Sequence, residues 1–227
     1  MLLLRFMVAR APEVLWTPSA ERIERSTLTR YQRWLQDTRG LSFTEYEDLW
    51  RWSVDSLEDF WSSLVEFCGV TWAAEPNGVF GSVAMPGTEW FPGARVSYPE
   101  HIFRRRDPGT VAIRHASELR ELGEWTWERL WEETAAVAAG LRALGVGPGD
   151  RVAAYMPNIP ETVAAFLACA SIGAVWSSAA PEFGARSVID RFAQIEPKVL
   201  LAVDGYRYGG RDLSLIHISE PTRQAEI

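Results

Sequence analysis

The second half of the chain alternates short apolar runs with amphipathic stretches, and tight turns separate them. The apolar runs predict strands at residues 111–113, 151–156, 174–178 and 198–203. Apolar positions at helical spacing predict helices at residues 127–144, 158–172 and 184–195. Thr126 is expected to cap the first helix and Gly145 to end it. Strands and helices in strict alternation are typical of an α/β fold with a parallel sheet covered on both faces.

The predicted sheet has an edge where ligands of such folds bind. In open parallel sheets, ligands lie outside the carboxyl ends of the strands. Those ends fall here at residues 156–158, 177–182 and 204–211. We therefore expect any small-molecule site of this chain to draw on these three segments.

The first hundred residues have a different pattern, with many tryptophans and few strand signals. Ser19 or Ser26 is positioned to cap a helix that runs toward Leu35, and Ser56 to cap a second helix that ends at Gly69. Gly and Pro recur between residues 74 and 99, which predicts a long ordered loop or linker. We expect a mostly helical, Trp-rich region that wraps the α/β part and has no independent core.

Charge and composition exclude several classes of protein. The 227 residues carry a formal charge of −7, so the chain has no long-range attraction for nucleic acid or an anionic membrane. We expect no signal peptide and no membrane span, since charges and glycine interrupt the apolar stretches. The two cysteines suit neither a disulfide framework nor a metal site. We therefore expect a cytoplasmic protein; the sequence does not indicate its oligomeric state.

Several motifs that resemble functional ones have simpler interpretations. The glycines of residues 145–150 follow a helix and precede a strand, whereas a phosphate loop follows a strand, so we interpret them as a turn. The glutamates at positions 118, 121, 124, 132 and 133 are interpreted as solvated charges on helix or loop surfaces. The three histidines lack metal-ligand spacing, and residues 104–106 read as an exposed basic loop. Lys198 is the only lysine, so chemistry that needs a lysine has one candidate.

Residues 204–211 form the segment with the most residues suited to binding a ligand. The sequence DGYRYGGR follows a predicted strand at the ligand-binding edge. Arg207 and Arg211 can bind phosphate through paired N–H groups, and the glycines allow a ligand to approach the backbone. Tyr206 and Tyr208 could stack on a base, although a solvated turn explains the composition equally well.

Several stretches of the chain resemble those of a known enzyme family. The stretches LWRWSV (49–54), LEDFW (57–61) and WFPGARV (90–96) look like the N-terminal region of acetyl-CoA-synthetase-like enzymes. The stretches GDRVAAYMPN (149–158) and ACASIGAV (168–175) look like the first sheet of the adenylate-forming ligases. The resemblance to these ligases covers about residues 14–212.

Three further stretches resemble the acetoacetyl-CoA synthetase branch more closely: RIERS (22–26), GLSF (40–43) and WSS (176–178). The resemblance implies an acetyl-CoA-synthetase-like N-terminal region at 1–100 and part of an AMP-binding domain at 101–212. Residues 213–227 differ in composition from the Ala/Arg/Gly-rich part before them, and we expect them to be a non-native tail.

The resemblance also implies a reaction and its cofactors. A small carboxylic acid reacts with Mg-ATP to give an acyl-adenylate and pyrophosphate, and the thiol of coenzyme A (CoA) then attacks the adenylate. Arg207 and Arg211 match arginines that hold the phosphates and adenine of CoA. Phe183, Gly184 and Ala185 match a Phe-Gly-Gly turn that approaches the adenine, with alanine at the second glycine. The resemblance assigns no catalytic residue and no metal ligand to this chain.

The resemblance further implies that this chain alone is inactive and binds CoA weakly at most. The Ser/Thr/Gly-rich loop ending in Pro-Lys and the later adenylation motifs are absent from the sequence. Residues 214–223 look like a translated sequencing adapter, so we expect the native sequence to end near Asp212. An acetyl- or propionyl-CoA synthetase fragment and a non-enzymatic CoA-binding remnant remain alternatives.

Overall fold

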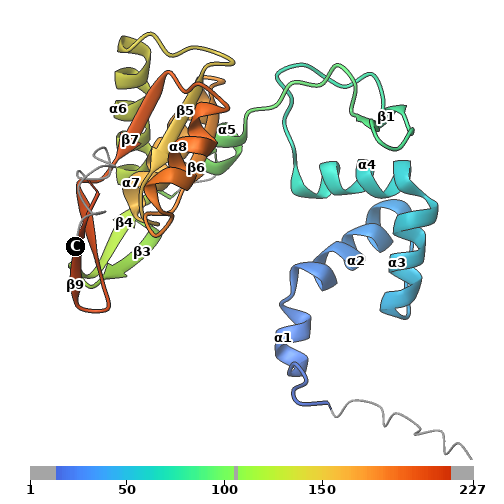
Figure 1. Ribbon diagram of the computed structural model, residues 1–227. Helices are drawn as coiled ribbons and strands as arrows, with labels where there is room; N and C mark the ends of the chain where they lie inside the picture. Colours follow the sequence, from blue (N-terminus) through green and yellow to red (C-terminus); the bar gives the residue numbers. More distant parts are fainter. Residues whose placement is uncertain (1–13, 105–106, 216–227) are drawn as a thin grey trace, which may run out of the picture. The chain divides into compact units, whose positions relative to one another are not determined.

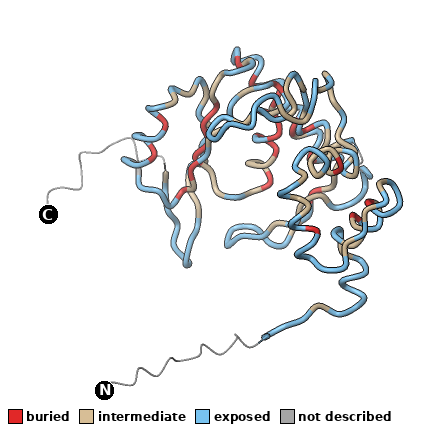
Figure 2. The backbone as a smooth tube through the Cα atoms, turned by 90° about the vertical axis from the view of Figure 1, so that its right-hand side faces the viewer, coloured by how far each residue is buried: buried red, intermediate tan, exposed pale blue. Residues whose placement is uncertain are grey.

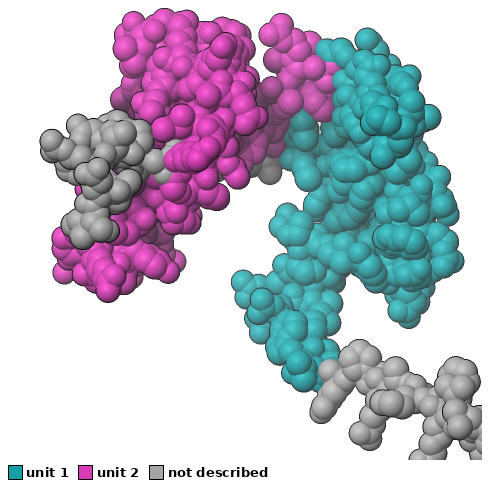
Figure 3. All heavy atoms as spheres, viewed as in Figure 1, with its two compact units in different colours: residues 1–70, 76–93 teal, residues 71–75, 94–227 magenta. Residues whose placement is uncertain are grey.

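The computed structural model describes residues 14–104 and 107–215. It divides the chain into two compact units, coloured separately in Figure 3. Unit 1 comprises residues 1–70 and 76–93, and unit 2 comprises residues 71–75 and 94–227. Figure 1 labels their helices and strands.

Unit 1 is mainly helical. It contains the helices α1 (Ala20–Glu24), α2 (Thr27–Arg39), α3 (Tyr46–Asp55) and α4 (Leu57–Cys68), and the short antiparallel strands β1 (Phe80–Ser82) and β2 (Glu89–Trp90). Ser19 and Ser26 each cap a helix, so the single helix expected before Leu35 is two. Helix α3 was not predicted, and the expected loop at 74–99 contains the β1–β2 pair and the start of α5 (Tyr98–Phe103).

Unit 1 has a small aromatic core of its own, which sequence analysis did not expect. Tyr31, Leu35 and Leu49 are buried, and they pack against a ring of partly buried side chains from α2, α3, α4 and the loop before α3. The Tyr31 hydroxyl lies 2.6 Å from the hydroxyl of Ser63, which is fully buried. Few residues of unit 1 are buried to this degree (Figure 2).

Unit 2 contains the predicted parallel sheet. Strands β5 (Arg151–Tyr155), β6 (Val175–Ala179) and β7 (Val199–Ala202) pair in parallel in the order β6-β5-β7. Helix α6 (Trp127–Ala143) precedes β5, and α7 (Pro160–Ser171) and α8 (Ala185–Ala193) lie between the strands in sequence, as predicted; α5 (Tyr98–Phe103) comes before them. Thr126 caps α6 by accepting the Arg129 N–H, which confirms its predicted role.

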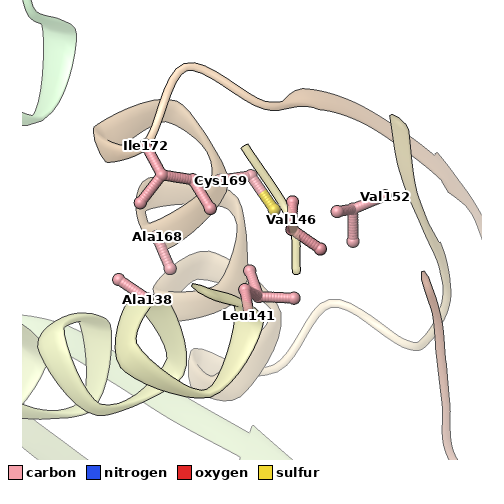
Figure 4. Packing of buried hydrophobic residues seen from close by; sticks show 7 residues of the cluster. All are labelled: Ala138, Leu141, Val146, Val152, Ala168, Cys169 and Ile172. Atoms are coloured by element: carbon pink, nitrogen blue, oxygen red, sulfur yellow. The ribbon is translucent and has the colours of Figure 1, made fainter. Parts of the chain in front are cut away.

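Different helices cover the two faces of this sheet. Successive residues of a strand point to opposite faces, so neighbouring residues of β5 contact different helices. Val152 packs with Leu141 of α6 and Cys169 of α7, as Figure 4 shows. Its neighbour Ala153 packs on the other face with Phe192 of α8. The α/β fold class with helices on both faces is thereby confirmed.

Two antiparallel hairpins complete unit 2. Strands β3 (Val111–Ser117) and β4 (Arg120–Thr126) form one, and β8 (Gly205–Tyr208) and β9 (Arg211–Ser214) form the other. The short strand expected at 111–113 is therefore longer and paired, and β4 was not predicted. Leu213 and Ser214, assigned to a non-native tail, pair with Tyr206 and Gly205 within β9. Residues 216–227 lie outside the described part of the chain.

Candidate functional site

A cavity of about 490 Å³ lies at the carboxyl ends of the parallel strands, where sequence analysis placed the ligand edge. Residues 157–159 follow β5, residues 180–182 follow β6, and residues 203–208 follow β7; all line the cavity. The β3–β4 hairpin adds Ser117, Leu119 and Arg120. The volume of the cavity is within the range of small-molecule sites, about 300–1,000 Å³.

Tyr155, the last residue of β5, fixes the loop that follows β6. Its hydroxyl donates to the backbone carbonyl oxygens of Pro181 (2.9 Å) and Phe183 (2.7 Å). Burial raises the pKa of Tyr155, and the nearby Tyr206 and Glu182 raise it further. The hydroxyl therefore stays protonated at neutral pH and can serve as the shared donor for this loop.

Arg207 lines the cavity from β8, and Asp212 of β9 holds it. The two residues face each other across the hairpin, and the Arg207 Nε and Nη2 atoms lie 2.6 and 2.9 Å from the Asp212 carboxylate oxygens. This ion pair raises the pKa of Arg207 and lowers that of Asp212. The guanidinium group is thus a fixed positive charge on the cavity wall.

The other predicted binding residues lie near the cavity lining. Arg211 is the first residue of β9 and is exposed opposite Tyr208. The lining of the β6 loop ends at Glu182, one residue before Phe183, whose ring lies 5.0 Å from the Arg191 guanidinium. Gly184 precedes α8, which starts at Ala185. A Cβ at Gly184 would meet no atom within 4 Å, so its backbone remains open to approach.

The β3–β4 hairpin contributes to the site, which was not predicted from the sequence. Arg120 reaches the cavity and binds the Glu161 carboxylate at 2.8 and 2.9 Å. Glu118, interpreted as a solvated charge, instead accepts two backbone N–H groups from the turn of the other hairpin. Glu124 lies in a strand and pairs with Arg114, so its assignment to a helix or loop was wrong. Only strand pairing could have revealed these positions.

Other features singled out in the sequence have structural roles. Residues 145–150 connect α6 to β5, which confirms the turn interpretation. The Asp150 carboxylate accepts the Gly147 N–H at 2.8 Å and the Lys198 ammonium group at 3.0 Å. His101 bonds to Thr71 and Ser97, whereas His217 falls outside the described residues. Within residues 14–104 and 107–215, no three potential metal-ligating side chains are grouped.

A second cavity of about 470 Å³ lies against α5, α6 and the end of α7. Trp131 and Arg142 contribute to its lining, but none of the strand carboxyl ends does. We therefore place the candidate site at the first cavity, which adjoins both predicted arginines. None of the helices in the described part of the chain is long and apolar enough to cross a bilayer.

The first cavity suits a ligand that carries phosphate. Arg207 offers a guanidinium group, and the adjoining Gly209–Gly210 turn offers backbone N–H donors that already hold a carboxylate. Tyr206 and Tyr208 add aromatic surface to the same wall.

Comparison with known proteins gives consistent matches. Residues 46–101 match the acetyl-coenzyme A synthetase N-terminus, and residues 102–225 match the AMP-binding enzyme family. The acetoacetyl-coenzyme A synthetase of Rhizobium meliloti (strain 1021) is 38% identical over 202 residues, which cover 89% of this chain and 31% of that protein. The acetoacetyl-CoA synthetase of Macaca fascicularis is 38% identical over 207 residues, covering 89% and 30%.

A solved structure agrees with these sequence matches. The acetoacetyl-CoA synthetase from Streptomyces lividans superimposes with a TM-score of 0.85 at 46% sequence identity, covering 92% of this chain and 33% of that one. The chain thus spans about 30% of the length of the curated relatives. With more than half of its residues matched to one family and its fold shared with a solved relative, the chain belongs to the AMP-binding enzyme family.

Proposed function

We propose that this chain is the N-terminal portion of an ATP-dependent acid–CoA ligase that acts on acetoacetate. The complete protein would convert acetoacetate, ATP and CoA to acetoacetyl-CoA, AMP and pyrophosphate, with Mg²⁺ as the metal of the nucleotide. The names of its relatives support the substrate, and their 38–46% identity over about nine-tenths of this chain supports the reaction class. The two free cysteines fit a cytoplasmic location.

Within this function, we propose that the cavity at the strand ends takes the nucleotide end of CoA. The observation that carries this proposal is the position of Arg207, which lines the cavity beside two tyrosines and next to a turn rich in N–H donors. Arg211, Phe183, Gly184 and Ala185 would complete the site around the lining residues. A guanidinium group suits this role because it binds phosphate without losing its charge.

Titration calorimetry of the chain with CoA tests this assignment. Wild type should bind weakly, and Arg207→Ala should remove most of the measurable heat because the cavity loses its fixed positive charge. Arg142→Ala is the matched control, since Arg142 lines only the second cavity. Absence of CoA binding by wild type, or equal binding by Arg207→Ala, would refute the assignment.

We also propose that this chain alone does not form the adenylate. Lys198, its only lysine, bonds to Asp150 and to the Gly145 carbonyl oxygen, so the one ammonium group serves the fold. No other lysine is available to stabilise the charge that develops on a triphosphate. An ATP–pyrophosphate exchange assay with acetoacetate should therefore give the background rate, and exchange above background would overturn this proposal.

Acetate is the second candidate substrate. The match of residues 46–101 to the acetyl-coenzyme A synthetase N-terminus favours it. The two candidates can be separated by comparing thioester formation from acetate and acetoacetate by the full-length protein encoded by the same DNA.

A further inference from the structure

Two hairpin turns of unit 2 meet through a carboxylate. The β8–β9 hairpin turns at Gly209 and Gly210, and the β3–β4 hairpin turns at Glu118 and Leu119. The Gly209 N–H donates to Glu118 Oε1 at 2.7 Å, and the Gly210 N–H donates to Glu118 Oε2 at 2.8 Å. Each carboxylate oxygen therefore has its own backbone donor, although the partners are 91 and 92 residues apart in sequence.

The backbone of this turn is shaped to hold an oxyanion. Gly209 and Gly210 have φ angles of 59° and 74°, so both lie in the left-handed region that favours glycine. Successive N–H groups of such a turn point toward one concave side, where they concentrate partial positive charge. A Cβ at either glycine would meet no atom within 4 Å, so side chains do not crowd the turn.

The position of the turn connects it to the candidate site. Gly209 directly follows Tyr208, the last lining residue of β8, and Glu118 lies between the lining residues Ser117 and Leu119. Glu118 also contributes to the raised pKa of Arg207, so the two side chains interact electrostatically. The N–H pair and the Arg207 guanidinium group thus lie together at the rim of the cavity, where Glu118 and Asp212 now occupy them as carboxylate partners.

Exposure of Glu118 means that this contact can open. Its side chain lies on the surface, so released carboxylate oxygens are rehydrated at once. An exposed contact of this kind contributes little stability, and water or a competing anion can replace it.

We infer that the Gly209–Gly210 turn is a phosphate subsite and that Glu118 is a resident carboxylate, which a ligand phosphate displaces. The identity of that ligand as CoA rests on the proposed function; the affinity of the turn for phosphate does not. Glu118 would lower the affinity for stray anions and release the N–H pair when a phosphate held also by Arg207 arrives.

Nuclear magnetic resonance of the whole chain tests the subsite independently of CoA. Inorganic pyrophosphate is titrated into wild type, Glu118→Gln and Glu121→Gln, and the amide resonances of Gly209 and Gly210 are followed. Glu121→Gln makes the same charge change on the same hairpin at an exposed residue. We expect saturable shifts of both amides, at pyrophosphate concentrations about three- to tenfold lower in Glu118→Gln than in wild type or Glu121→Gln.

A CoA titration of the same variants separates the two proposals. Unmoved glycine amides, or equal affinities in Glu118→Gln and Glu121→Gln, would overturn the subsite even if wild type binds CoA. Saturable pyrophosphate shifts that are enhanced in Glu118→Gln support the subsite even if wild type binds no CoA, a result that would refute only the proposed CoA site. Chemical shifts elsewhere in unit 2 show whether each variant remains folded.

Discussion

At the scale of single residues, unit 1 depends on a buried polar contact inside an aromatic cluster. The Ser63 hydroxyl donates its proton to the Phe60 carbonyl oxygen at 2.7 Å. In the hydrogen bond between Tyr31 and Ser63, the Tyr31 hydroxyl is therefore the donor. Burial raises the pKa of Tyr31, so the donor proton is retained at neutral pH. This bond positions α2 against α4 without introducing a charge.

Tyr31→Phe should lower the free energy of unfolding of unit 1 by about 0.5–1.5 kcal/mol, because one buried hydrogen bond is lost while packing is kept. Urea unfolding followed by tryptophan fluorescence measures this change, since tryptophans 34 and 52 pack in the same cluster. Tyr46→Phe serves as the control because Tyr46 is 66% exposed. Equal stability of the two variants would show that the Tyr31 hydroxyl contributes nothing.

The ionisation of Asp150 makes the stability of unit 2 depend on pH. The Gly147 N–H, and then the Lys198 ammonium group, lower its pKa below the ordinary value of 3.8. A carboxyl group with a lowered folded-state pKa stabilises the fold above its unfolded-state value, and this stability is lost as pH falls through the folded-state value.

As the pH is lowered from neutral to below 3.8, the stability of unit 2 should therefore fall less in Asp150→Asn than in wild type. Thermal unfolding of unit 2 over this range measures the effect, with Asp190→Asn as an exposed control. A wild-type and an Asp150→Asn profile of the same shape would contradict the linkage.

At the scale of elements, sequence patterns predicted apolar strands and capped helices well and polar strands poorly. Strands β5 and β7 are apolar runs in a parallel sheet, and α6 begins at a capping threonine, so both signals are local. Exposed residues make up at least half of each of the strands β4, β8 and β9, so their sequences look like polar loops. Their pairing, and the contact of Glu118 with Gly209, depend on partners far away in sequence.

Gly205 is the tightest point of the β8–β9 hairpin. A Cβ there would lie 2.7 Å from the Leu213 carbonyl oxygen, a backbone atom that moves only if the strands separate. Gly205→Ala should therefore loosen the hairpin and speed amide hydrogen exchange at residues 205–214. Gly140→Ala is the control, because a Cβ at this position in α6 meets no atom within 4 Å. Unchanged exchange in Gly205→Ala would mean that the hairpin tolerates the extra methyl group.

At the scale of the whole molecule, the chain presents open edges of its parallel sheet. Within the described residues, β6 and β7 each pair only with β5, so their outer N–H and C=O groups face away from the sheet. Val175 and Leu200 on these strands are 50% and 56% exposed. Exposed apolar edges favour pairing between chains.

Purified chain should therefore self-associate with rising concentration in sedimentation velocity. Leu200→Lys should reduce this association because an edge lysine opposes strand pairing. Leu144→Lys, at a 63% exposed position beyond the end of α6, should not reduce it. A wild-type chain that stays monomeric at every concentration would contradict this prediction.

The most direct test of the proposed function uses a chimera in which residues 14–212 replace the matching part of the Streptomyces lividans acetoacetyl-CoA synthetase, to which this chain is 46% identical. The chimera should form acetoacetyl-CoA. Arg207→Ala should raise its KM for CoA about tenfold while leaving acetoacetate-dependent ATP–pyrophosphate exchange unchanged. A folded chimera that forms no thioester, or an Arg207→Ala variant with an unchanged KM for CoA, would contradict the account.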